Sequence, residues 1–119
     1  MRSWNLSEID TPGGSISPVV LHSDDEAARA VLIGLEPGQE LGDHQVKEHA
    51  FLVVVDGSVR VDAGGDVADA GPGTLVVFEP DERRTVSSDR GARILLLLAP
   101  WPGAGHYRGG DSRIERAAG

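Results

Sequence analysis

The sequence predicts an all-β protein, a sandwich or barrel of antiparallel strands. Sixteen glycines and seven prolines are spread along the 119 residues, where they punctuate short runs rich in valine, leucine and isoleucine. Short apolar runs between turn residues are typical of the strands of such folds. The segment EAARAV (26–31) has helical propensity, but it continues into VLIGL without a residue that would end a helix, so it is interpreted as strand.

Seven strands are expected, and turn residues separate each from the next. The expected strands span residues 17–22, 28–36, 50–56, 58–62, 74–78, 83–88 and 92–99. The turn signals between them are Ser23-Asp24-Asp25, Pro37-Gly38, Asp56-Gly57, Gly64-Gly65, Gly71-Pro72-Gly73 and Arg90-Gly91.

Three of these strands are apolar at every position: Phe51 to Val55, Leu75 to Phe78, and Ile94 to Leu98. A strand with one solvated face would alternate apolar and polar residues. If one face fills a barrel, the other needs cover from a second layer or another subunit, because a large exposed apolar patch favours aggregation. The simple expectation is a homodimer.

The charge balance argues against polyanionic partners. Eleven basic and 19 acidic residues give a net charge of -8, whereas nucleic acids and anionic membranes bind positive surfaces. Without cysteine the chain has no disulfide and no thiolate, so His, Asp and Glu are the remaining metal ligands. The N-terminus lacks the apolar core of a signal peptide and ILLLLAPWP is far short of a membrane span, so we expect a soluble, cytoplasmic protein.

We expect one domain with three parts: an N-terminal segment with an edge strand (1–27), a barrel core (28–99) and a C-terminal tail (100–119). The tail is glycine-rich and polar, with one helical turn predicted near DSRIER. Its Trp101, His106 and Tyr107 could fold over the barrel or pack on a partner subunit. Trp4 is expected to cap the open end of the core or to lie in the dimer contact.

The order of motifs resembles a single-domain cupin over residues 28–99. The stretches that carry this resemblance are LEPGQELGDH, FLVVVDGSVRV, AGPGTLVVFEPDERRTV and ARILLLLAP. In the first cupin motif a glycine is followed by five residues and a His-x-His pair, then by a glutamate and a closing glycine. Gly38, His44 and Gly57 stand at the matching positions. The resemblance implies a jelly-roll β-barrel of two packed antiparallel sheets.

The metal ligands of the cupin motifs are largely replaced. Val46 stands in place of the second histidine, and Ala50 in place of the glutamate. In the second motif Thr85, or Arg84 with a one-residue slip, stands in place of the last histidine. The resemblance therefore implies a degenerate metal site, in which His44 alone keeps its position.

Two sets of candidate site residues follow. For ligand binding we predict His44, Arg84 and Thr85, because an inward arginine would bind a carboxylate or phosphate through paired hydrogen bonds; Arg83 is the weaker arginine candidate. For a metal the candidates are His44, His49 and Glu48, with His106 as a further histidine. Adjacent residues of a regular strand face opposite ways, so Glu48 and His49 could not both enter the barrel.

Three functions remain open. The leading hypothesis is a small cupin that binds a small molecule, an anion being the favoured kind, in its barrel. The second is a metal-dependent enzyme of dioxygenase or isomerase type, with a divalent transition metal in a rebuilt His/Glu site. The third is a structural dimer without substrate, whose barrel its own side chains fill.

Overall fold

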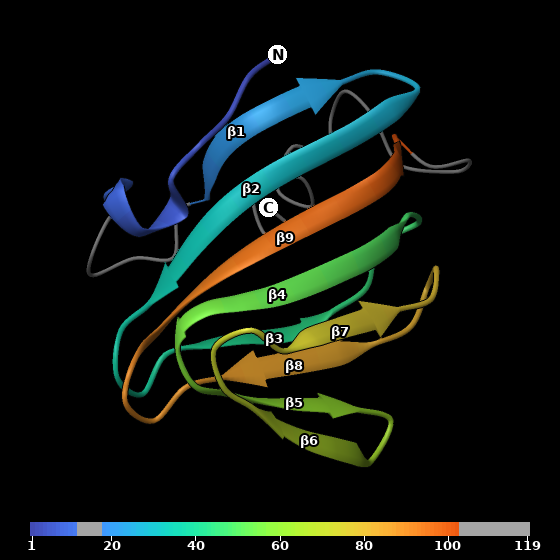
Figure 1. Ribbon diagram of the computed structural model, residues 1–119. Coiled ribbons are helices and arrows are strands. Elements are labelled where there is room, and N and C mark those ends of the chain that lie inside the picture. Colours follow the sequence, from blue (N-terminus) through green and yellow to red (C-terminus); the bar gives the residue numbers. More distant parts are fainter. Residues whose placement is uncertain (12–17, 103–119) are drawn as a thin grey trace.

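The computed structural model describes residues 1–11 and 18–102, and it leaves the side chains of Asp43 and His44 undescribed. One 3-10 turn and nine strands make up the described part of the chain (Figure 1). The elements are η1 (Leu6–Glu8), β1 (Val19–Asp24), β2 (Ala27–Leu35), β3 (Glu40–His44), β4 (His49–Gly57), β5 (Val59–Ala63), β6 (Asp66–Ala70), β7 (Leu75–Phe78), β8 (Arg84–Ser87) and β9 (Ala92–Trp101).

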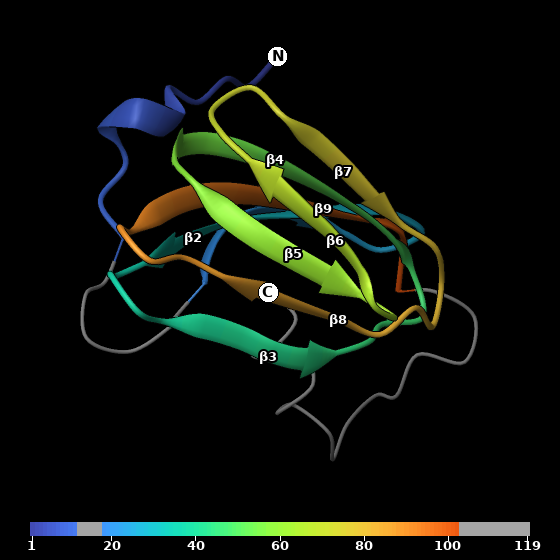
Figure 2. The same cartoon turned by 90° about the horizontal axis from the view of Figure 1, so that it is seen from below.

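The strands form two antiparallel sheets that face each other. The five-stranded sheet has the order β1-β2-β9-β4-β7, and the four-stranded sheet has the order β3-β8-β5-β6. Figure 2 shows the four-stranded sheet in front of β2, β9 and β4. From β2 onward most connections carry the chain from one sheet to the other, which is the winding of a jelly roll. The predicted all-β fold of two packed antiparallel sheets is confirmed.

The segment with helical propensity, residues 26–31, is held as strand from residue 27 onward by pairing with β1 and with β9, which lies far away in the sequence. Residues 27–35 form β2, which pairs with β1 on one side and with β9 on the other. Glu26 lies in the preceding turn with a φ of 68°. Two ladders of backbone hydrogen bonds outweigh a local helical preference, which is weak for so short a segment. The interpretation of this segment as strand is confirmed.

Two strands, β3 and β6, were absent from the sequence prediction. β3 has the polar sequence ELGDH, and four of the five residues of β6 are exposed. Both strands lie at the edges of the four-stranded sheet. A search for apolar runs does not find edge strands of this kind, because their sequences contain no run of apolar residues.

The core lies between the sheets and is made by alternate residues of the strands. At one end of the barrel, which we call the apolar end, its members are aliphatic: Leu35, Val54, Val59 and Ile94. The middle is filled by Val31, Leu52, Val61, Val86 and Leu96. Because β2, β4 and β9 are register neighbours, these side chains form rows across the five-stranded sheet.

Two close contacts of glycines lie at the apolar end, one with the backbone and one with a side chain. A Cβ atom added at Gly57 would lie 2.2 Å from the carbonyl oxygen of Gly91, and one added at Gly34 would lie 2.2 Å from Oγ1 of Thr11. At Gly57 the nearest atoms belong to the backbone, so a larger side chain would force a strand end to move, whereas at Gly34 the side chain of Thr11 would have to shift. The N-terminal segment is also tied here, since Nη1 of Arg93 donates hydrogen bonds to the carbonyls of Leu6 and Ser7 at 3.0 and 3.1 Å.

Several expectations for the chain ends have different outcomes. Trp4 is exposed and lies beside His22 of β1, with ring centroids 6.5 Å apart, so it is not buried against the core, and its place in a dimer contact stays a prediction. Trp101 is buried in the core at the end of β9. His106, Tyr107 and the helical turn near DSRIER lie outside the described residues. No helix in the described residues is long and apolar enough to span a membrane.

Candidate functional site

The segment that leads into β4 brings a carboxylate into the barrel. Val46, Glu48 and Ala50 are buried, whereas Lys47 and His49 are exposed. The alternation of β4 therefore extends backward past the first residue of the strand. Glu48 is 0 % exposed. The sequence had left open whether Glu48 or His49 enters the barrel, and the structure places Glu48 there.

The turn before β8 is held against this segment. The backbone N–H of Asp81 donates a 2.7 Å hydrogen bond to the carbonyl of Val46, and Nζ of Lys47 lies 2.7 Å from the Asp81 carboxylate. Asp81 has a φ of 66°, a left-handed conformation that aspartate tolerates better than most residues. This contact sets where β8 begins, and so which of its residues face inward.

Arg84 is the inward residue at the start of β8. It is 6 % exposed, and burial alternates along the strand so that Arg84 and Val86 are buried while Thr85 is half-buried on the opposite face. Thr85 lies across from Asp62 of β5. Arg83 is exposed. Of the three residues predicted around the second motif, the strand turns Arg84 toward the barrel interior.

The surroundings of Arg84 leave part of its guanidinium available. The carbon Cζ lies 4.9 Å from the centroid of the Phe78 ring, and Nη1 is buried with no hydrogen-bond partner among the described residues. Burial lowers the pKa of Arg84, and the nearby charges of Glu82 and Glu48 act in the opposite direction. Because an arginine starts from so high a pKa, it stays protonated at neutral pH. The barrel thus contains a permanent cation with an unused donor.

A second arginine reaches the same end of the barrel and was missed by the sequence analysis. Arg29 of β2 lies in register with Leu98 of β9, and its Cζ is 4.9 Å from the centroid of the buried Trp101 ring. Arg29 is two residues before Val31, a core residue, so period-two alternation along β2 could have identified it. We call the inward charged residues Arg29, Glu48 and Arg84 the polar end of the barrel.

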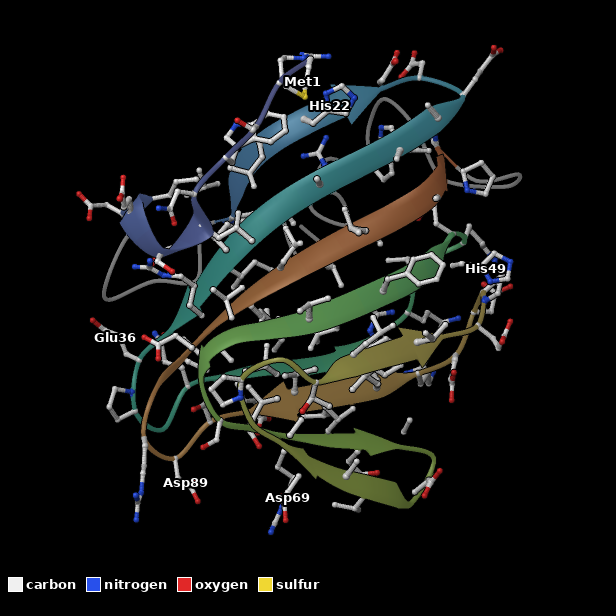
Figure 3. The ribbon with its side chains drawn as sticks, in the orientation of Figure 1. Met1, His22, Glu36, His49, Asp69 and Asp89 are labelled. Carbon is white, nitrogen blue, oxygen red and sulfur yellow. The ribbon has the colours of Figure 1, made fainter. Side chains whose placement is uncertain are left out.

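The structure gives the backbone position of His44, and both the backbone and the side chain of His49. The register of β3 and β8 sets the backbone of His44 directly opposite Arg84. His49 projects away from the sheets (Figure 3), is 46 % exposed, and has Nδ1 3.4 Å from the carboxylate of Glu79. Among the described residues no three His, Asp or Glu side chains are grouped as metal ligands. The structure therefore separates His49 from Glu48, and a metal site built on His44 stays a prediction.

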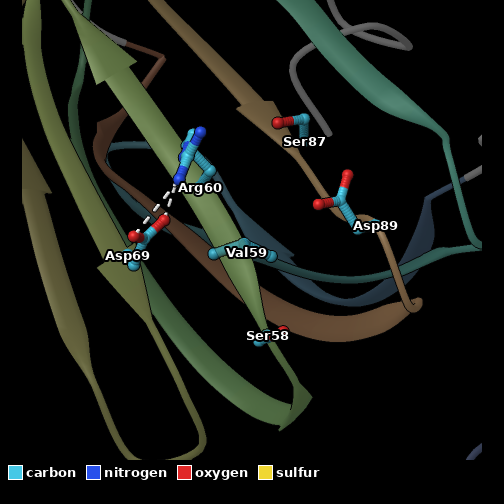
Figure 4. Close-up of a pocket in the computed structure, with 6 residues that line it drawn as sticks. All are labelled: Ser58, Val59, Arg60, Asp69, Ser87 and Asp89. Atoms are coloured by element: carbon cyan, nitrogen blue, oxygen red, sulfur yellow. Dashed lines mark hydrogen bonds and ion pairs between the residues drawn. The ribbon is translucent and has the colours of Figure 1, made fainter.

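The outer surface of the four-stranded sheet carries a depression of a different kind. Its volume is about 200 Å³, and it is lined by Ser58, Val59, Arg60, Asp69, Ser87 and Asp89. Figure 4 shows Arg60 turned toward Asp69, with Nε 3.0 Å from the carboxylate. This pair is solvated, and it raises the pKa of Arg60 and lowers the pKa of Asp69. Because Nε and Nη2 of Arg60 already donate to the Asp69 carboxylate, Arg60 is a weaker candidate for binding a ligand.

Comparison with known proteins identifies the family. Residues 27–98, more than half of the chain, match the family model described as an AraC-like ligand binding domain. The chain belongs to this family. The AraC-like ligand-binding domain begins with β2 and ends within β9, so it contains all three residues of the polar end. No curated protein matches the chain.

Several solved structures similar to this AraC-like domain are described as cupins. An RmlC-like cupin protein from Desulfovibrio desulfuricans is 24 % identical, with a TM-score of 0.74 over 84 % of this chain and 97 % of that chain. A Klebsiella pneumoniae protein with a double-stranded β-helix domain is 17 % identical, with a TM-score of 0.75 over 91 % and 99 %. An RmlC-like cupin from Shewanella frigidimarina is 22 % identical, with a TM-score of 0.69 over 78 % and 83 %. The predicted membership of the cupin superfamily is confirmed.

Proposed function

We propose that this protein binds a small anionic molecule inside its barrel, with Arg84 as the principal anchor. The observation that carries the proposal is the buried Nη1 of Arg84, which has no hydrogen-bond partner among the described residues. A buried donor without an acceptor costs about 1–3 kcal/mol. A carboxylate or phosphate would offset that cost with charge-assisted hydrogen bonds. The ligand-binding description of the family model agrees with this function.

His44 is the second anchor in this proposal. Its backbone stands directly opposite Arg84 in the β3–β8 register, and histidine is a side chain that can donate a hydrogen bond to an anion. Thr85 contributes to the ligand only if the start of β8 shifts, because it lies on the other face from Arg84. The apolar walls of Phe78 and Ala50 would contact the uncharged part of the molecule.

Thermal unfolding with a panel of carboxylates and phosphates tests this function. At least one anion should raise the melting temperature of the wild type by several degrees, since a ligand at a hundred times its Kd adds about 2.7 kcal/mol. Arg84→Met and His44→Ala should each lose most of that shift. Arg60→Met is the matched control, because it removes an exposed arginine that Asp69 already pairs. An Arg84→Met protein that keeps the full shift would move the ligand away from the barrel.

Glu48 favours a second candidate function, that of a metal-dependent cupin enzyme. It is a fully buried carboxylate on the inward face, and it could join His44 as a ligand of a divalent transition metal. The described residues do not complete such a site, and the buried cation of Arg84 would repel the metal. Metal analysis of protein purified without chelator or affinity-tag metal decides between the two: a substantial fraction of one ion per chain, lost in Glu48→Gln, would favour the enzyme.

We also propose that two copies of the chain associate through the outer face of the five-stranded sheet. Val77, Phe51 and Leu97 are neighbours in one row across β7, β4 and β9, and Leu75, Val53 and Leu95 form the next row. Leu75 is 57 % exposed and Val77 is 47 % exposed. Continuous apolar rows of this kind are typical of subunit contacts, and a second copy would present the same rows.

Light scattering on a sizing column tests the dimer. Val77→Lys should convert the protein to monomer, whereas Val67→Lys should not, because Val67 is equally exposed but lies on β6 of the other sheet. A wild type that elutes as monomer at micromolar concentration would refute the association. A dimer that no anion or metal stabilises would instead support a structural role without substrate.

A further inference from the structure

We propose that Asp81 is a positioning residue for Arg84: without touching the ligand, it sets where the guanidinium lies inside the barrel. This inference deepens the function proposed above and rests on that function for its effect on affinity. Its effect on the place of Arg84 needs no ligand, so it can be measured on the free protein.

The sheet ladders give little support to two of the charged residues at the polar end. The ladder between β8 and β5 extends no further than Thr85, and the ladder between β8 and β3 changes register just before it reaches Arg84. Glu48 lies one residue before the start of β4. Both residues are nevertheless buried, Arg84 at 6 % exposed and Glu48 at 0 %. Their places therefore depend on contacts outside the ladders.

Asp81, in the turn between β7 and β8, supplies such contacts. Its backbone N–H donates a 2.7 Å hydrogen bond to the carbonyl of Val46, and its own carbonyl accepts a longer one of 3.4 Å from Nε2 of Gln45. Its carboxylate lies 2.7 Å from Nζ of Lys47. Three groups of one residue thus contact three successive residues of the segment that leads to Glu48. We call these contacts the Asp81 clasp.

The turn that carries Asp81 is closed on itself. The N–H of Glu82 donates to the carbonyl of Glu79 at 3.1 Å, and the N–H of Glu79 donates to the carboxylate of Glu82 at 3.0 Å. Asp81 lies inside this closed turn with a φ of 66°, and Arg84 follows three residues later. A closed turn moves as a unit, so the conformation of Asp81 determines the direction in which the chain enters β8.

Burial makes Arg84 sensitive to this support. Desolvation of a charged guanidinium is costly, and burial lowers the pKa of Arg84. The negative charges of Glu82 and Glu48 offset part of that cost. The clasp joins the turn that carries Glu82 to the segment that carries Glu48, so it keeps both charges near the guanidinium. We therefore expect Arg84 to leave the barrel for water when the clasp is broken.

The test uses the two non-glycine residues with a positive φ in the described chain, Asp81 and Glu26. A β-branched residue disfavours this conformation strongly, so Asp81→Val should break the clasp. Glu26→Val is the matched control: Glu26 is also exposed, also donates its N–H to a distant carbonyl, and lies beside β1 at the other edge of the five-stranded sheet from β7. Asp81→Gly keeps the turn, because glycine adopts a positive φ freely, and loses only the contact with Lys47.

The first measurement is made without ligand, by NMR exchange of the Nε proton of Arg84, assigned by its absence in Arg84→Met. Exchange should be at least about tenfold faster in Asp81→Val than in the wild type, because the guanidinium reaches water. Glu26→Val and Asp81→Gly should exchange at close to the wild-type rate. If Asp81→Val does not fold, Asp81→Ala and Glu26→Ala give the same comparison, since alanine is less strained at a positive φ than valine.

The second measurement is the affinity for inorganic phosphate and for butanoate, by calorimetry. Asp81→Val should lose at least about tenfold in affinity, as expected for one charge-assisted hydrogen bond. Glu26→Val and Asp81→Gly should lose less than about threefold, since an exposed ion pair contributes little.

The outcomes separate this inference from the proposed function. Wild-type exchange in a folded Asp81→Val protein would refute the positioning role, and so would equal acceleration in both valine variants, which would indicate a general loss of stability. If neither phosphate nor butanoate binds the wild type, anion binding fails for these two probes, and the exchange rates alone decide whether Asp81 positions Arg84.

Discussion

Replacement of Gly57 by alanine tests how the apolar end of the barrel is closed. Gly57 has a φ of 76°, and a Cβ atom there would lie 2.2 Å from the carbonyl oxygen of Gly91 and 2.8 Å from Cα of Ala92. Both of these atoms belong to the backbone, and Gly57 and Ala92 are paired in the β4–β9 ladder. The contact can therefore relax only if the end of one strand moves.

Gly38→Ala is the matched control for this prediction. Gly38 has a similar φ of 85°, but an added Cβ atom would meet nothing within 4 Å. A left-handed conformation costs alanine about 1–2 kcal/mol relative to glycine, and this cost is common to both variants. The gain from a stiffer unfolded chain is also shared, so it cancels in the difference.

The clash should add about 1–3 kcal/mol to the effect of Gly57→Ala, as overpacking commonly does. We therefore expect losses of about 1–2 kcal/mol in the free energy of unfolding for Gly38→Ala and about 2–5 kcal/mol for Gly57→Ala. Equilibrium unfolding in urea measures both, at one protein concentration because subunit association would contribute to stability. Equal losses in the two variants would show that the close approach of β4 and β9 does not constrain the fold.

Three further predictions concern single side chains. Ser88→Ala should cost about 1–3 kcal/mol of unfolding free energy in urea, because its buried hydroxyl donates to a carbonyl at 2.6 Å and accepts from an amide at 2.9 Å; its half-buried neighbour Ser87→Ala should change little, and the reverse order would contradict the argument. His49→Ala should shift thermal stability by less than about 0.5 kcal/mol, and a larger loss would mean that His49 has a role beyond its exposed contact. Arg60 lowers the pKa of Asp69, so the pair stabilises the fold above the unfolded aspartate pKa of about 3.9 and this contribution is lost as the pH falls through the lower folded pKa. In Arg60→Met, carboxyl titration by NMR should show the Asp69 pKa back near its ordinary value, and an unmoved pKa would contradict the assignment.

The fold was predictable because its central strands carry apolar residues on both faces, one face buried in the core and the other partly buried. Such strands appear in the sequence as unbroken apolar runs, and β4 and β9 are the clearest examples. The two missed strands, β3 and β6, lie at sheet edges and carry polar sequences, so no apolar run marks them. The interpretation of residues 26–31 as strand was correct, because the apolar residues that follow them pair with β9.

The candidate site was predictable only in part, since it depends on which residues of each strand turn inward. The second motif places Thr85, or Arg84 after a one-residue slip, at the position of the last histidine, so the sequence could not choose between Arg84 and Thr85. The contact between Asp81 and Val46 fixes the start of β8 and brings Arg84 inside. Arg29 lies before the first residue of either motif, and only the alternation of inward and outward residues along β2 indicates it.

The separation of the apolar end from the polar end determines which residues can be substituted without loss of the fold. Packing at the apolar end depends on aliphatic side chains and on the backbone contact at Gly57, whereas the charged residues lie toward the other ends of the strands. We therefore expect joint substitutions at Arg29, Glu48 and Arg84 to change which ligands the barrel binds while most variants still fold. A library confined to these positions would offer new ligand preferences at a low cost in misfolded members, which makes the chain a practical starting point for engineered binding proteins.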